Sequence, residues 1–83
     1  MIIDKILEFM KSDRDFKIAK GMTETTSLIR SGAVDSFSIV KLVLFLEKTF
    51  GIKILQGDLS ERNFDTLKSI EKLVEEKMKK NSP

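Results

Sequence analysis

Apolar positions recur at helical spacing in three stretches of the chain, at about residues 2–11, from 35 or 36 to 51, and from about 65 onward. In each stretch, apolar residues three and four positions apart line up as one stripe, which is the pattern of an amphipathic helix. No stretch alternates for long enough to predict a strand. The pattern therefore predicts an all-α bundle with three long helices.

A long connection separates the first two of these helices. From about residue 13 to 34 the apolar residues follow neither the helical nor the strand spacing. Turn signals occur there at Gly21, in the run "TETTS" and at the pair Ser31-Gly32. The apolar residues of this connection are scattered, and we expect them to hold it against the core: Phe16, Ile18, Met22, Leu28 and Ile29. So long an irregular segment is unusual, which counts either against this segmentation or for a specialised fold.

The second helix has clear signals at both ends. Asp35 is a good N-cap, since its carboxylate can accept a hydrogen bond from the backbone N–H of Phe37 or Ser38. Gly51 stands where a helix commonly ends in a left-handed residue. The following "IKIL" alternates for only four residues, so we expect a loop there.

A short helix is predicted before the last long one. In "GDLSERNF", Asp58 and Glu61 have the spacing of a capping box, with Asp58 in the place of the cap. Asp65 and Thr66 are both competent caps for the last helix. The predicted bundle thus has three long helices and one short helix.

The second helix is apolar on more than one face. At about 100° per residue, one sector holds the expected core face: Ile39, Leu42, Val43, Leu46 and Phe50. The opposite sector mixes apolar and basic residues, with Phe45 at its edge: Phe37, Lys41, Leu44 and Lys48. Val40 and Glu47 lie on the border between the two sectors.

Two explanations fit that outer face. The helix is either central and buried on both sides, or it presents a strip for a partner. Lys41 and Lys48 stand in the middle of the outer sector, and lysines are seldom buried without partners. We therefore expect a solvent-exposed outer face, on which Phe37 and Leu44 are available to a partner.

Composition removes several classes of function. The chain has 83 residues, which is one domain, and it contains neither Cys nor His. Disulfides and thiolate metal sites are therefore excluded, and the usual general base and zinc ligand are missing. We expect no metal site, and an enzyme that works alone is not favoured.

Charge and hydropathy restrict the partners. The formal charge is only +2, and the basic residues are scattered apart from the tail "EEKMKKNSP", in which residues 78–83 are expected to be frayed. A nucleic-acid binder would show a basic stripe with interleaved aromatics, so this class is disfavoured. The charged N-terminal stretch is no signal peptide, and no apolar run is long enough to span a bilayer. A cytoplasmic protein without membrane insertion is expected.

Ser36 occupies the first turn of the second helix. Backbone N–H groups and the positive end of the helix dipole lie there, so an attached phosphate would be tolerated. A serine hydroxyl needs an adjacent base to act as a nucleophile, and no His is present to serve. By itself, an Asp-Ser pair before an apolar run is most often a plain helix cap.

The stretch "SGAVDSFSIVKLVLFLEKTFGIKI" resembles the centre of an acyl carrier protein. That family has an Asp-Ser pair after a loop, usually followed by Leu, and then an apolar helix that ends in Glu-x-x-Phe-Gly-Ile. Asp35 and Ser36 match, Phe37 takes the usual Leu place, and "EKTFGI" matches the end. The flanking "TTSLIRSGAVDS" and "DLSERNFDTLKSIEKLVEEK" are similar to the family's loop, short helix and last helix, so the resemblance covers essentially the whole chain.

The resemblance implies an acyl-carrier-like four-helix bundle with a long first loop. Ser36 would carry a 4′-phosphopantetheine arm, installed from coenzyme A by a phosphopantetheinyl transferase that recognises Asp35. The arm's thiol would present acyl groups to acyl-loading and acyl-processing enzymes, and the bundle interior near Ile39, Val43, Leu46 and Ile70 would shelter them. The implied protein is a monomeric carrier and not an enzyme. The expected partner surface on the second helix is Phe37, Val40, Lys41, Leu44, Glu47 and Lys48.

One departure from the family and several alternatives stay open. Typical members carry carboxylates along the second helix, whereas Lys41 and Lys48 stand here and Ser38 is uncharged. Since charge governs partner choice, we expect dedicated partners in a specialised fatty-acid, lipid or polyketide pathway. The alternatives are a peptidyl or aminoacyl carrier of a nonribosomal or D-alanyl type pathway, and a helical adaptor that is never modified.

Overall fold

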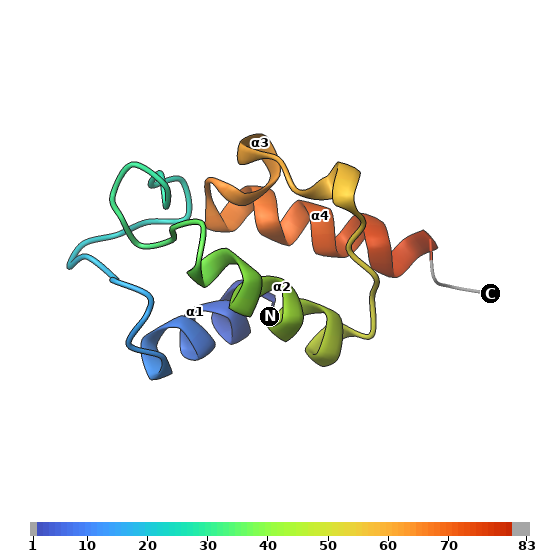
Figure 1. Ribbon diagram of the computed structural model, residues 1–83, viewed down its shortest axis with the longest axis horizontal. Coiled ribbons are helices and arrows are strands. Elements are labelled where there is room, and N and C mark those ends of the chain that lie inside the picture. Colours follow the sequence, from blue (N-terminus) through green and yellow to red (C-terminus); the bar gives the residue numbers. More distant parts are fainter. Residues whose placement is uncertain (1, 81–83) are drawn as a thin grey trace.

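Figure 1 shows the computed structural model, in which residues 2–80 are described. The three long helices are α1 (Ile2–Ser12), α2 (Ser38–Phe50) and α4 (Leu67–Lys80). The short helix α3 (Glu61–Phe64) follows a 3-10 turn, η1 (Gln56–Asp58). No strand occurs in residues 2–80, so the described chain is all-α, with the predicted three long helices and one short helix.

The core lies between the three long helices. α1 contacts both α2 and α4, α2 contacts α4, and α3 lies on α4 (Figure 1). Each long helix contributes fully buried apolar side chains from its predicted stripe: Ile6, Met10, Leu42, Leu46, Ile70 and Val74. Burial of these stripes stabilises helices that would be marginal in water by themselves.

The long connection is irregular, as predicted, and it is held at several points. Phe16 and Leu28 are buried in the core, whereas Ile29, also expected to pack inward, is 37% exposed. The backbone N–H of Leu28 donates to the carbonyl of Asp65, and that of Lys68 donates to the carbonyl of Glu24. The loop is therefore bonded to the start of α4, which lies far along the sequence.

Helix α2 begins two or three residues later than expected. Residues 36 and 37 form a turn, and the helix runs from Ser38 to Phe50. The carbonyl of Asp35 nevertheless accepts from the backbone N–H of Ile39, so Asp35 still precedes the first helical turn. Gly51 ends the helix in the left-handed region, at φ 64°, as predicted.

The expected cap of the short helix was wrong. Ser60, and not Asp58, caps α3, since its hydroxyl accepts from the backbone N–H of Asn63 at 3.3 Å. Asp58 instead accepts from the backbone N–H of Leu55 and forms an ion pair with Lys77 of α4. A carboxylate held by α4 is not placed to cap α3.

Of the two residues expected to cap α4, only Thr66 does so. The Thr66 hydroxyl accepts from the backbone N–H of Ser69 at 3.0 Å, which is an N-cap bond. Asp65 faces the long connection instead and accepts from the Ser27 hydroxyl at 2.6 Å. Helix α4 continues to Lys80, and the rest of the tail that was expected to be frayed, 81–83, lies outside the described residues.

Candidate functional site

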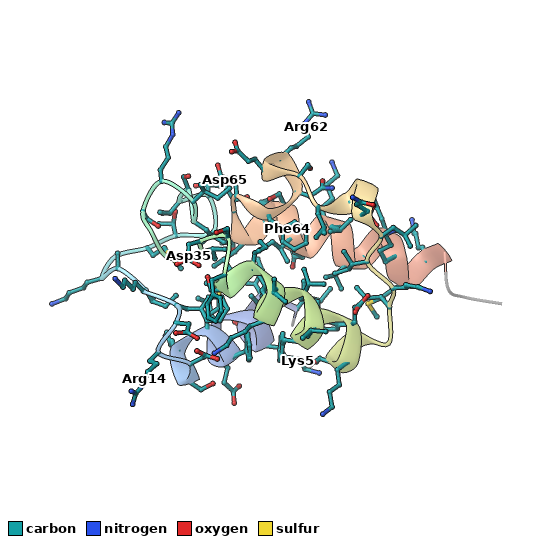
Figure 2. All side chains as sticks on the ribbon, in the orientation of Figure 1. Lys5, Arg14, Asp35, Arg62, Phe64 and Asp65 are labelled. Carbon is teal, nitrogen blue, oxygen red and sulfur yellow. The ribbon has the colours of Figure 1, made fainter. Side chains whose placement is uncertain are left out.

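Asp35 lies at the junction of the long connection and α2 (Figure 2). Together with Ser38 it fixes the turn that carries Ser36. One Asp35 carboxylate oxygen accepts from the backbone N–H groups of Phe37 at 2.9 Å and Ser38 at 2.8 Å. In return, the Asp35 backbone N–H donates to the Ser38 hydroxyl at 2.9 Å. This reciprocal pair is a capping box with Ser in the usual Glu place, and it confirms Asp35 as the cap.

The same hydrogen bonds keep Asp35 charged. The backbone N–H of Ser38 is the largest cause that lowers the pKa of Asp35 below its ordinary 3.8, with further lowering by Phe37 and by the positive charge of Lys17. Asp35 is therefore an anion at neutral pH, directly beside Ser36.

The Ser36 side chain is exposed, and no residue within 2–80 forms a hydrogen bond with its hydroxyl. This side chain is therefore accessible from solvent. The expectation that a phosphate on Ser36 would meet free N–H groups needs correction, because those of Phe37 and Ser38 already donate to Asp35.

An apolar pocket of about 320 Å³ opens beside Ser36. Segments from the long connection, the start of α2 and the region of α3 form its lining, which comprises Ile29, Val34, Asp35, Ser36, Ile39, Leu59, Ser60, Glu61 and Phe64. Of the four residues expected to shelter an apolar group, Ile39 alone lines it. Leu46 and Ile70 are fully buried in the core. The apolar space therefore lies on the α3 side of the bundle and not at its centre.

Helix α2 presents an exposed apolar strip next to this site. Phe37, Val40 and Leu44 are between 58% and 68% exposed, and Lys48 is exposed beyond them. The expected exposure of Phe37 and Leu44 is thus confirmed. We call Phe37, Val40 and Leu44 the α2 strip.

Two charged residues expected to face partners are bonded within the molecule. Lys41 forms ion pairs with Asp13, at 3.3 Å, and with Asp15. The hydrogen bond that the Lys41 ammonium donates to the Asp15 carboxylate is the main cause that raises the pKa of Lys41. The Glu47 carboxylate accepts from the backbone N–H of Ile54 at 2.9 Å. Lys41 is therefore not the free outward charge that its position on the helix indicated, and Glu47 holds the segment after α2.

Comparisons with protein-family models, with curated proteins and with solved structures found no match for this chain. Within residues 2–80, no group of three or more metal-binding side chains is brought together. None of the helices described there has the length and apolar character needed to cross a membrane.

Sequence reasoning missed four apolar residues of the pocket lining: Ile29, Val34, Leu59 and Phe64. Ile29 and Leu59 lie in irregular segments, where no period indicates which way a side chain faces. Phe64 lies in a helix too short for a stripe, and its side chain points into the molecule, whereas Arg62 points away (Figure 2). Their apolar character in polar surroundings was the only signal available.

Proposed function

We propose that this chain is an acyl carrier protein of the cytoplasm, with a 4′-phosphopantetheine arm attached to Ser36. The observation that carries the proposal is an exposed serine, on a turn fixed by Asp35, at the edge of an apolar pocket. When bound, the arm would supply a thiol that holds acyl groups as thioesters. The absence of Cys from the chain agrees with a sulfur that comes from outside.

The residues present fit such a group. Ser36 Oγ would form the phosphodiester bond, and the pyrophosphate bond of coenzyme A would break to release adenosine 3′,5′-bisphosphate. The hydroxyl proton would go to a base of the transferase, because the chain has no His. Asp35 holds the turn that carries Ser36, through its bonds to the backbone N–H groups of Phe37 and Ser38.

The pocket favours an acyl over an aminoacyl cargo. Five of its lining residues are Ile29, Val34, Ile39, Leu59 and Phe64, so its interior is mainly apolar. An apolar chain gains free energy by leaving water for such a surface, whereas a charged amino group would lose hydration. The α2 strip would contact the loading and processing enzymes, with the carrier acting as a monomer.

Intact-mass measurement tests this proposal. The folded protein is incubated with coenzyme A and a transferase of broad specificity, and we expect the mass of one phosphopantetheine to be added. Ser36→Ala should abolish the gain. Ser60→Ala is the matched control, since Ser60 is also exposed on the rim of the same pocket and should leave the gain intact.

The exposed α2 strip gives the unmodified adaptor as the second candidate, because it could bind a partner without any arm. The same measurement separates the two functions. A folded chain that gains no mass, and that is unmodified when purified from its own cells, would be an adaptor.

A further inference from the structure

Two exposed apolar side chains, Ile29 and Leu59, line the pocket beside Ser36 and come from separate segments of the chain. We call these two side chains the pocket walls. Ile29 is 37% exposed and Leu59 is 51% exposed, whereas Val34 and Phe64 are almost completely buried at the pocket's inner surface. Removal of apolar side chains of this size from water lowers the free energy. Because both side chains line the pocket and are exposed, an apolar group that enters the pocket would cover them.

Asp65 fixes the backbone that carries Ile29. Its carboxylate accepts from the Ser27 hydroxyl at 2.6 Å and from the Ile29 backbone N–H at 3.2 Å. Its carbonyl accepts from the N–H of Leu28, which is fully buried. The Ser27 hydroxyl also accepts from the Arg30 N–H at 3.0 Å. One side of the pocket is therefore held by a residue at the α3–α4 junction.

The segment that carries Leu59 is held in a similar way. Leu59 directly follows Asp58, whose carboxylate pairs with Lys77 and accepts from the Leu55 backbone N–H. The Asp58 carbonyl accepts from the Asn63 side-chain amide at 2.9 Å. Bonds made by Asp65 and Asp58 thus hold the backbone segments that carry Ile29 and Leu59 to the rest of the fold.

We propose that Ile29 and Leu59 set the size of the apolar group that the pocket accepts, and that Asp65 is the positioning residue for Ile29. This inference rests on the proposed function, since the apolar group is the acyl chain carried from Ser36. Hydrogen bonds and an ion pair hold the two segments that carry these side chains to the rest of the fold. Because both side chains are exposed, truncation of either one should widen the pocket without creating a cavity in the core.

The test compares butyryl, octanoyl and dodecanoyl forms with the form that carries the bare arm. These are made by loading the matching acyl-coenzyme A derivatives onto Ser36. We expect the midpoint of thermal unfolding to rise with chain length in the wild-type protein until the pocket is full. The NMR signals of the Val34 and Ile39 methyl groups should shift on acylation.

The wall variants are Ile29→Ala and Leu59→Ala. Each should reduce the rise in unfolding temperature caused by the octanoyl group to less than half of the wild-type value. Leu55→Ala is the matched control, since Leu55 is 53% exposed and does not line the pocket. This variant should keep the full rise.

Asp65 is tested by a pair of variants. Asp65→Ala removes the acceptor for Ser27 and Ile29 and should abolish the dependence on chain length. Asp65→Asn keeps an acceptor oxygen and should restore it. A merely structural role would lower the unfolding temperature of every form equally and would leave the differences between chain lengths unchanged.

The outcomes separate this inference from the proposed function. Absence of loading on Ser36 overturns both. Normal loading, with the same acyl-induced rise in unfolding temperature in the wild type, Ile29→Ala and Leu59→Ala, overturns the inference alone. Val34 and Ile39 methyl signals that do not shift on acylation also overturn it.

Discussion

The Asp35 carboxylate caps α2 and also carries the negative charge that the cap stabilises. Its bonds to the backbone N–H groups of Phe37 and Ser38 span only two and three residues. Such local geometry can be read from the sequence, and the predicted cap is confirmed. The return bond from the Asp35 N–H to the Ser38 hydroxyl is not indicated by the usual capping-box pattern, which has Glu or Gln and not Ser in that place.

Removal of the Asp35 charge should change how stability depends on pH. The folded pKa of Asp35 lies below its ordinary 3.8, so the charged form stabilises the fold. That contribution is complete above 3.8 and is lost as the pH falls through the lowered folded value. Asp35→Asn keeps an acceptor but no charge. The wild type should therefore be slightly more stable than the variant at neutral pH, with a difference that shrinks under acid.

Urea unfolding of both proteins at several pH values measures this difference. The pKa of Asp13 is also lowered, chiefly by the backbone N–H of Asp15, but it titrates in both proteins and cancels in the comparison. A difference that stays constant from neutral pH to strong acid would show that the charge plays no part in the cap.

At the scale of elements, periodicity located the helices, and competing caps were resolved by the tertiary fold. Asp58 and Ser60 are both chemically able to cap α3, and the sequence gives no reason to choose Ser60. Lys77 of α4, nearly twenty residues away, forms an ion pair with Asp58, and Ser60 caps α3 instead. Gly51 needed no such information, because the end of α2 requires a left-handed residue locally.

Substitution of Gly51 and of Gly57 by Ala tests whether the left-handed backbone at Gly51, and not a steric clash, determines the loss of stability. A Cβ added at Gly51 or at Gly57 would meet no atom within 4 Å, but only Gly51 has a positive φ, of 64°. Gly51→Ala should therefore destabilise the fold by about 1–2 kcal/mol, the cost of a left-handed residue with a side chain. Gly57→Ala should be near neutral. Chemical denaturation measures both, and equal losses would contradict the assignment of the cost to the backbone of Gly51.

At the scale of the whole molecule, the contacts that shape the site join distant parts of the chain. Ser27 and Asp65 are 38 residues apart, and Lys41 is 28 residues from Asp13. Hydrophobic periodicity says nothing of such pairs, which is why the pocket beside Ser36 and the pairing of Lys41 were not predicted. The serine, its cap and the exposed α2 strip depend on local pattern, and these were found from the sequence.

These long-range pairs also set the charge that a partner would meet. Lys41 is neutralised by Asp13 and Asp15, and Glu47 is bonded to the segment after α2. The α2 strip itself is apolar, with Lys48 as an exposed charge beyond it. Electrostatic steering by a basic partner surface would find no carboxylate on this strip.

If the chain is a carrier, general fatty-acid synthase components should process it slowly, because such components meet acidic carriers through basic surfaces. The loaded protein is assayed for elongation beside an acidic carrier, at low and at high salt. We expect a lower kcat/KM for this chain and a weaker dependence on salt, since few exposed charges take part. The double variant V40E/K48E places carboxylates on the same face and should raise the rate at low salt. Elongation of the wild type at the rate of the acidic carrier would show that the apolar strip is sufficient for docking and that no dedicated partner is needed.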